Sequence, residues 1–136
     1  MSGFNNCGIR KLNISMNQGA DFNLVITISG EDGPIDITGY SFLGEMRQST
    51  EAGEPVVGEF VFTIKDQVLY KGQVQWSLPA STIEEIVTST ANPLEKCRLT
   101  TPFVYDVKMK TSGGALSRIL EGIAYVSPQA TQEDFT

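Results

Sequence analysis

Carboxylates are the side chains of this sequence that are numerous enough to do chemistry. The 136 residues include 16 Asp and Glu but no His. Without His, the sequence lacks the usual general base, the commonest metal ligand and every Ser/His or Cys/His nucleophilic arrangement. A carboxylate pair alone can hydrolyse a glycosidic bond if the two acids flank a sugar-binding cleft. The acids are instead scattered over predicted turns and outward strand positions, so we expect no catalytic residues and no enzyme.

Two groups of acids lie close together in the sequence. Glu84 and Glu85 fall in the predicted first turn of a helix, where carboxylates complement the helix dipole. Glu31, Asp32 and Asp36 surround a Gly-Pro turn, but they lack the Asp-x-Asp-x-Asp-Gly order of a calcium loop. We interpret both groups as structural, and we expect no metal and no other cofactor.

The cysteines and the net charge narrow the possible partners. Cys7 and Cys97 have no Cys or His nearby that would complete a metal or redox motif, so we expect two free thiols. The formal net charge of -6 works against nucleic-acid binding, which needs a clustered positive surface. No apolar run approaches the roughly 18 residues needed to cross a bilayer, and the first residues lack the apolar stretch of a signal peptide. We expect no nucleic acid, no membrane and no export.

Apolar residues at every second position are the dominant pattern of the chain. In an extended strand this period places them all on one face. The alternation is clearest in residues 22–28, and it returns in 60–64, 74–78, 103–109 and 120–126. We predict one core between two sheets, formed by Phe22, Leu24, Ile26, Phe42, Phe60, Phe62, Val74, Trp76, Tyr105 and Val107.

One helix and one long loop interrupt the predicted strands. Ser81 and Glu84 have the spacing of a capping box, which predicts a helix over Thr82–Val87. Residues Thr88–Thr101 show no period and predict a long loop, which in a compact domain tends to be a functional surface.

The number of strands bears on the fold class. About seven or eight short strands, separated by turn residues, favour an all-β sandwich, although the period alone also fits a barrel. Because no repeat or shift of composition divides the sequence, we expect one β-sandwich domain over residues 1–136.

Several short motifs follow one another in a characteristic order along the chain. They are Asn17–Phe22, Gly33–Tyr40, Met46–Arg47, Gly72–Pro79, Thr82, Tyr105–Val107, Glu121–Gly122 and Val126. The segment Asp36-Ile37-Thr38-Gly39-Tyr40 is the most distinctive of them. This order resembles a family of tailed-bacteriophage virion proteins, in particular the N-terminal domain of phage baseplate upper proteins. The similarity covers nearly the whole chain and rests on strands and turns.

The resemblance implies an immunoglobulin-like sandwich that docks onto other virion proteins. The leading hypothesis is therefore a non-enzymatic tail or baseplate component, assembled in the host cytoplasm, with other virion proteins and copies of itself as partners. A head decoration or neck protein is the first alternative. A carbohydrate-binding module that recognises the host surface is the second, and it would require exposed aromatic residues clustered on one face.

Two lone aromatic residues and one loop are the predicted contacts with partners. Phe4 and Phe135 lie in polar terminal segments, where an aromatic side chain has no strand to belong to, and buried aromatic anchors are common binding hot spots. We therefore predict that both ends of the chain and the 92–99 loop contact neighbouring subunits. The predicted contact residues are Phe4, Asn92, Pro93, Leu94, Leu99 and Phe135.

Overall fold

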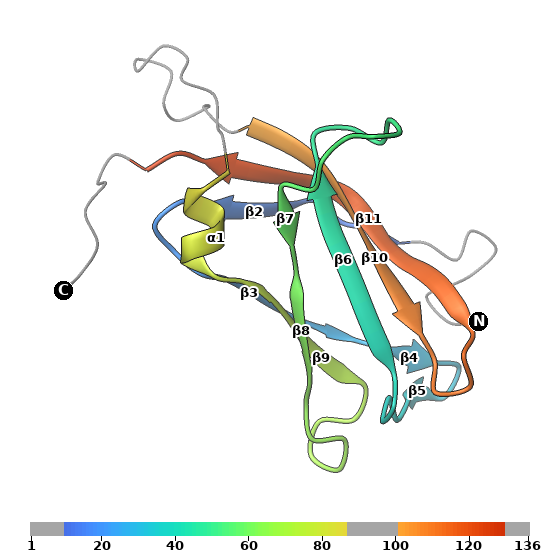
Figure 1. Cartoon of the computed structure of the whole chain (residues 1–136). Coiled ribbons are helices and arrows are strands. Elements are labelled where there is room, and N and C mark those ends of the chain that lie inside the picture. Colours follow the sequence, from blue (N-terminus) through green and yellow to red (C-terminus); the bar gives the residue numbers. More distant parts are fainter. Residues whose placement is uncertain (1–9, 87–100, 130–136) are drawn as a thin grey trace.

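The computed structural model describes residues 10–86 and 101–129, which form an all-β, immunoglobulin-like sandwich (Figure 1). The large sheet has the strand order β1-β11-β10-β6-β7, and β2 also pairs with β11. Its strands are β1 (Arg10–Lys11), β2 (Ile14–Asn17), β6 (Ser41–Arg47), β7 (Gly58–Glu59), β10 (Thr101–Lys110) and β11 (Leu116–Ser127).

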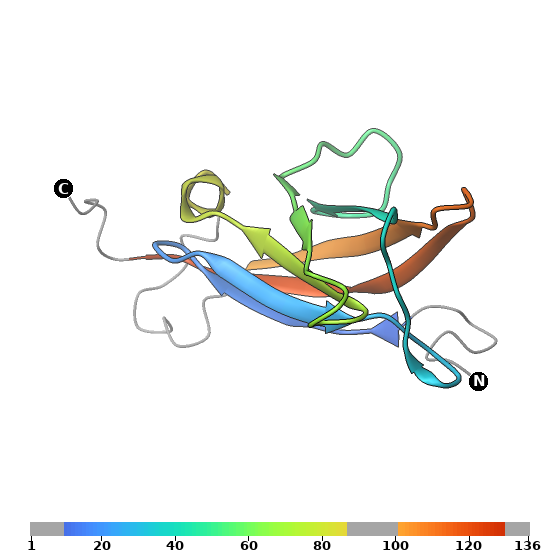
Figure 2. The same cartoon turned by 90° about the horizontal axis from the view of Figure 1, so that it is seen from below.

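The small sheet packs over the large one and has the order β3-β9-β8, with antiparallel pairing throughout. Figure 2 shows the two layers from below, with β2 in the large sheet and β3 in the small sheet. The remaining elements are a two-strand hairpin and one helix. The bounds are β3 (Phe22–Thr27), β4 (Ser29–Gly30), β5 (Gly33–Pro34), β8 (Val61–Ile64), β9 (Gln73–Leu78) and α1 (Ala80–Glu84).

The core between the sheets is the predicted one. Trp76 is fully buried at its centre, and the rings of Phe22, Phe60, Phe62 and Tyr105 surround it at centroid distances of 4.9–6.3 Å. Six of the ten predicted core residues are buried, and the other four are partly buried against them. The buried six are Phe22, Phe60, Val74, Trp76, Tyr105 and Val107, and the partly buried four are Leu24, Ile26, Phe42 and Phe62.

The number of strands agrees with the predicted seven or eight if the strands of only two residues are left out. Seven of the described strands have four or more residues, and the other four have only two residues each. Of the loop predicted over Thr88–Thr101, only Thr101 is described, and it is the first residue of β10.

The prediction for the helix was wrong in its bounds and its cap. The helix α1 spans Ala80–Glu84, and its N-cap is Pro79, which makes no side-chain cap hydrogen bond. The reason lies in the turn before β3, where the carboxylate of Asp21 accepts a hydrogen bond from the Ala80 N–H at 2.8 Å. An acid from a neighbouring loop thus satisfies an orphan amide of the first turn, and the helix begins before Ser81 can act as its cap.

The distinctive 36–40 segment is a structural crossing between β5 and β6. The carboxylate of Asp36 accepts two hydrogen bonds from Thr38, at 2.9 Å from the backbone N–H and at 2.6 Å from the hydroxyl. Ile37 is fully buried, and Gly39 has a φ of 83°, which favours glycine. The role of the 36–40 segment in this fold is therefore to bury Ile37 while the chain reverses.

The Asp36 turn predicts a pH-dependent contribution to stability. The Thr38 hydroxyl, then the Thr38 N–H, hold the pKa of the Asp36 carboxyl below its ordinary value of 3.8. A carboxyl whose pKa is lower in the folded state stabilises the fold above the unfolded pKa, and this contribution is lost as the pH falls through the folded pKa. We expect Asp36→Ala to lower the urea midpoint at neutral pH and to have little effect well below pH 3.8.

Asp36→Asn is the matched control, because an amide keeps the acceptor oxygen but does not titrate over this range. It should retain most of the neutral-pH stability. An equal loss for Asp36→Ala at both pH values would contradict the assignment.

Candidate functional site

The sequence-predicted contact residues lie outside the described parts of the chain. This applies to Phe4, Asn92, Pro93, Leu94, Leu99 and Phe135, as well as to Cys7 and Cys97. A site must therefore be sought among residues 10–86 and 101–129, where two surfaces stand out: a loop at one end of the sandwich and the outer face of the large sheet.

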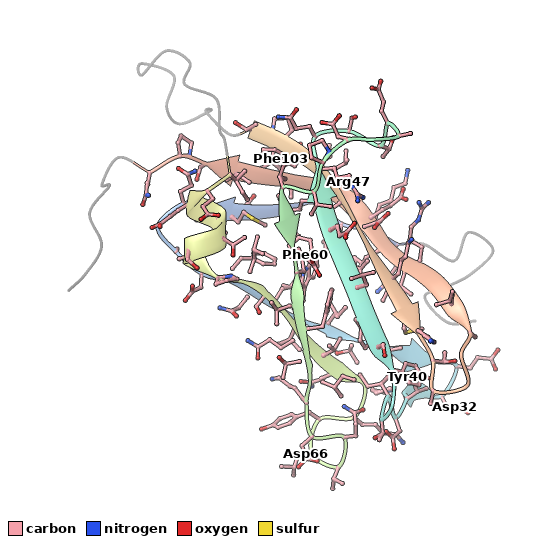
Figure 3. The ribbon with its side chains drawn as sticks, viewed as in Figure 1. Asp32, Tyr40, Arg47, Phe60, Asp66 and Phe103 are labelled. Carbon is pink, nitrogen blue, oxygen red and sulfur yellow. The ribbon has the colours of Figure 1, made fainter. Side chains whose placement is uncertain are left out.

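The loop between β8 and β9 exposes three consecutive apolar side chains. Val68 is 92% exposed, Leu69 71% and Tyr70 47%. We call these three residues the apolar tip. The loop protrudes from the far end of the small sheet, where Figure 3 labels the adjacent Asp66. Single exposed apolar residues are ordinary on a protein surface, but three in a row at a protruding tip form a candidate contact site.

The amide of Gln67 holds this loop in one conformation. Its carbonyl oxygen accepts hydrogen bonds from the N–H groups of Gly72, at 2.8 Å, and Ile37, at 3.1 Å. Its NH2 group donates to the carbonyl of Lys65 at 2.7 Å. One side chain therefore ties both arms of the loop together and fastens them to the crossing segment.

The backbone of the loop is also constrained from within. The N–H of Tyr70 donates to the carbonyl of Asp66 at 2.7 Å, and the Asp66 carboxylate accepts from the N–H of Val68 at 2.9 Å. The Lys65 ammonium lies 5.0 Å from the centroid of the Tyr70 ring, within the range of a cation–π contact. The apolar tip is thus presented on an ordered loop, which lowers the entropic cost of binding.

The outer face of the large sheet carries a row of acids. Glu45, Asp106 and Glu121 lie directly opposite one another on β6, β10 and β11. Like charges in such positions repel, and two arginines offset the repulsion. Arg118 lies 3.2 Å from Glu121 and 3.9 Å from Asp106, and Arg47 lies 2.8 Å from Glu45.

A shallow hollow of about 850 Å³ covers this acidic row, bordered by the 49–54 loop. Of the ion pairs that line it, the one between Arg118 and Asp106 joins two strands, and the other two lie within β6 and within β11. Tyr105 also lines it, but its hydroxyl donates to the carbonyl of Leu12, and burial raises the pKa of that hydroxyl. The hollow is therefore lined by charged residues, part of which already form ion pairs.

Two of the acids singled out in the sequence take part in local backbone structure. Asp36 forms the turn with Thr38, and Glu85 is the C-cap of α1. Within residues 10–86 and 101–129, no group of three or more Cys, Asp or Glu side chains is placed to hold a metal ion. The helix found in these residues is too short and too polar to cross a bilayer.

Comparisons with known proteins find similar chains among solved structures. No protein-family model and no curated protein matches the sequence. Among solved structures, murine CRIg aligns with 86% of this chain and 92% of its own, with a TM-score of 0.36 and 9% sequence identity. At these values the likeness carries no argument about function, and the fold rests on the two sheets and their shared core.

Proposed function

We propose that this chain is a non-enzymatic structural protein of a tailed-bacteriophage particle that binds other virion proteins in the tail or baseplate. The observation that carries the protein-binding role is the apolar tip, Val68-Leu69-Tyr70, exposed on a loop that hydrogen bonds hold in place. The resemblance of the sequence motifs to baseplate proteins supports the phage assignment.

The energetics of the tip favour a protein as its partner. Water contact with three apolar side chains costs free energy that a partner pocket would recover, at about 25 cal/mol for each Å² of apolar area buried. A chain with a net charge of -6 is repelled by anionic bilayers, so the overall charge does not favour a lipid surface. Aromatic side chains in desolvated pockets are common hot spots of protein interfaces, and Tyr70 is such a side chain.

The alternatives differ in what they would require. A head decoration or neck protein would use the same tip, and only its position in the particle would differ. A carbohydrate-binding module needs several exposed aromatic rings on one face. Among the described residues, Tyr70 is the one aromatic side chain of the strongly exposed apolar group, so this part of the chain offers no such platform.

A charged substitution in the apolar tip is expected to reduce the incorporation of the chain into particles without unfolding it. Leu69→Asp places a charge in the partner's apolar pocket, and we expect incorporation to fall by at least about tenfold, as for other hot-spot residues. The measurement is quantitative mass spectrometry of particles purified from cells that carry the complete phage genome with the altered gene.

Leu116→Asp is the matched control, because Leu116 is 75% exposed at the start of β11. Both variants should unfold at the wild-type temperature, since substitutions at such exposed positions change stability by only about 0.5 kcal/mol. Equal incorporation of the two variants would remove the tip from the interface, and absence of the wild-type chain from particles would overturn the proposed function.

A further inference from the structure

Strand β3 is an edge strand with a free side. It pairs with β9 alone, and no other strand in the described residues lies on its second side. The Ile28 N–H donates to the Gly72 carbonyl at 2.8 Å, and this bond shows which alternate residues of β3 are hydrogen-bonded to β9. Because hydrogen-bonded positions alternate, the N–H and C=O groups of Asn23, Val25 and Thr27 point away from β9.

The sequence of β3 has none of the features that protect edge strands from pairing. Such edges commonly carry a Lys, a Pro, a bulge or an inward-pointing charge. The six residues Phe22–Thr27 include no charged residue, no Pro and no Gly, and their pairing with β9 is regular over the full length. The side chains of Asn23, Val25 and Thr27 are exposed on the outer face.

The inward face of β3 is also incompletely covered. Leu24 and Ile26 point toward the core but remain only partly buried, unlike Val74 and Trp76 on the neighbouring strand. Two hollows lie beside the free side, one of about 410 Å³ lined by Leu24 and one of about 640 Å³ lined by Val25 and Ile26. A further strand at this edge would cover apolar surface and would also form hydrogen bonds with the outward N–H and C=O groups of β3.

We propose that the free side of β3 pairs with β3 of a second copy of this chain. In an antiparallel arrangement about a twofold axis at Val25, the three outward positions of one strand bond to those of the other. Val25 then faces Val25, and each Asn23 faces a Thr27, so no charge meets a like charge. The two small sheets become one continuous antiparallel sheet.

The sequence of β3 indicates that the partner at this edge is a second copy of the chain. An antiparallel pair centred on Val25 is self-complementary, as an isologous interface requires, and the apolar Leu24 of one copy lies opposite Ile26 of the other. The six-residue pair alone is smaller than the roughly 800 Å² that each partner buries in a stable interface. The exposed Leu12, which lines the hollow beside Ile26, adds apolar area to the contact.

This inference is tested on the purified full chain and does not depend on the phage assignment. Sedimentation equilibrium from micromolar to millimolar concentration should show a monomer–dimer equilibrium. Val25→Lys brings two like charges together at the axis, and Val25→Pro removes a donor that points away from β9, leaving the β3–β9 ladder intact. We expect each variant to raise the dimer dissociation constant by at least about tenfold.

Thr63→Lys is the matched control. Thr63 lies in the same cross-strand row as Val25, on the far side of Gln75, and its side chain is exposed. It should leave the dissociation constant unchanged. Circular dichroism and melting of all three variants would show that the fold is kept.

Amide hydrogen exchange identifies what occupies the edge. The amide hydrogens of Asn23, Val25 and Thr27 should exchange rapidly in dilute solution and slowly where the dimer forms. Slow exchange in the monomer would mean that a segment of the same chain, such as residues 1–9, covers β3, and the proposal would be wrong. A monomer at every concentration would overturn it as well, and would leave the edge to another virion protein.

Discussion

Phe60→Ala is expected to remove a large part of the stability of the fold. Phe60 lies where the chain passes from β7 in the large sheet to β8 in the small sheet, and Figure 3 labels it between the two sheets. It is 5% exposed, and its ring packs edge-on against Trp76 at a centroid distance of 4.9 Å. Truncating a buried Phe costs roughly 3–5 kcal/mol, against a total of about 5–15 kcal/mol for a typical domain.

Urea unfolding of the purified chain measures this loss. Phe62→Ala serves as the comparison, since Phe62 follows the same alternation but is only partly buried, stacked between Phe42 and Trp76. We expect Phe62→Ala to lower the free energy of unfolding by clearly less than Phe60→Ala. If the two losses were equal, the assignment of Phe60 to the centre of the core would fail.

Gly122→Ala is expected to detach the first strands from the large sheet. A Cβ at position 122 would stand 2.0 Å from the carbonyl oxygen of Leu12 and 2.7 Å from its carbonyl carbon. These are backbone atoms, so no rotamer change can relieve the overlap. The segment is held there by the Leu12 N–H, which donates to the Glu121 carbonyl at 2.9 Å, and by the Tyr105 hydroxyl.

The expected cost is about 3 kcal/mol, at the upper end of the range for overpacked sites, because backbone must move. Faster amide exchange at Leu12 and at the β2 residues would accompany it. Gly113→Ala is the control, since a Cβ there would meet only the Thr111 hydroxyl oxygen at 3.9 Å. Wild-type stability of Gly122→Ala would show that β1 and β2 do not lie against β11 as described.

The core was predictable because its signal is local and repeated. Alternating apolar residues in β3, β8, β9 and β10 specify which side chains face inward. Burial of Trp76 between two sheets then follows from its place in one of these strands. The depth to which each inward residue is buried was harder to predict from the sequence, because it depends on the neighbouring strands. Leu24 and Ile26 are only partly buried, and no strand among residues 10–86 and 101–129 pairs with the second side of β3.

The apolar tip and the helix cap were missed for two different reasons. Val68-Leu69-Tyr70 is a short apolar run that resembles part of a strand, and only the loop hydrogen bonds of Gln67 place it at a protruding tip. Three apolar residues between Asp66 and Gly72, in the stretch that joins the alternating segments 60–64 and 74–78, were the available signal. The cap depends on Asp21, which is 59 residues away from Ala80 and is brought there by tertiary folding.

An electron-microscopy reconstruction of the tailed-phage particle would test most directly whether the chain is a virion component that binds other proteins through its apolar tip. We expect density for this sandwich in the tail or baseplate, with Val68, Leu69 and Tyr70 buried in an apolar pocket of another virion protein. Density on the head or neck would move the protein to the alternative location. A complete particle without this chain, or one in which the tip faces solvent in every copy, would contradict the proposed function.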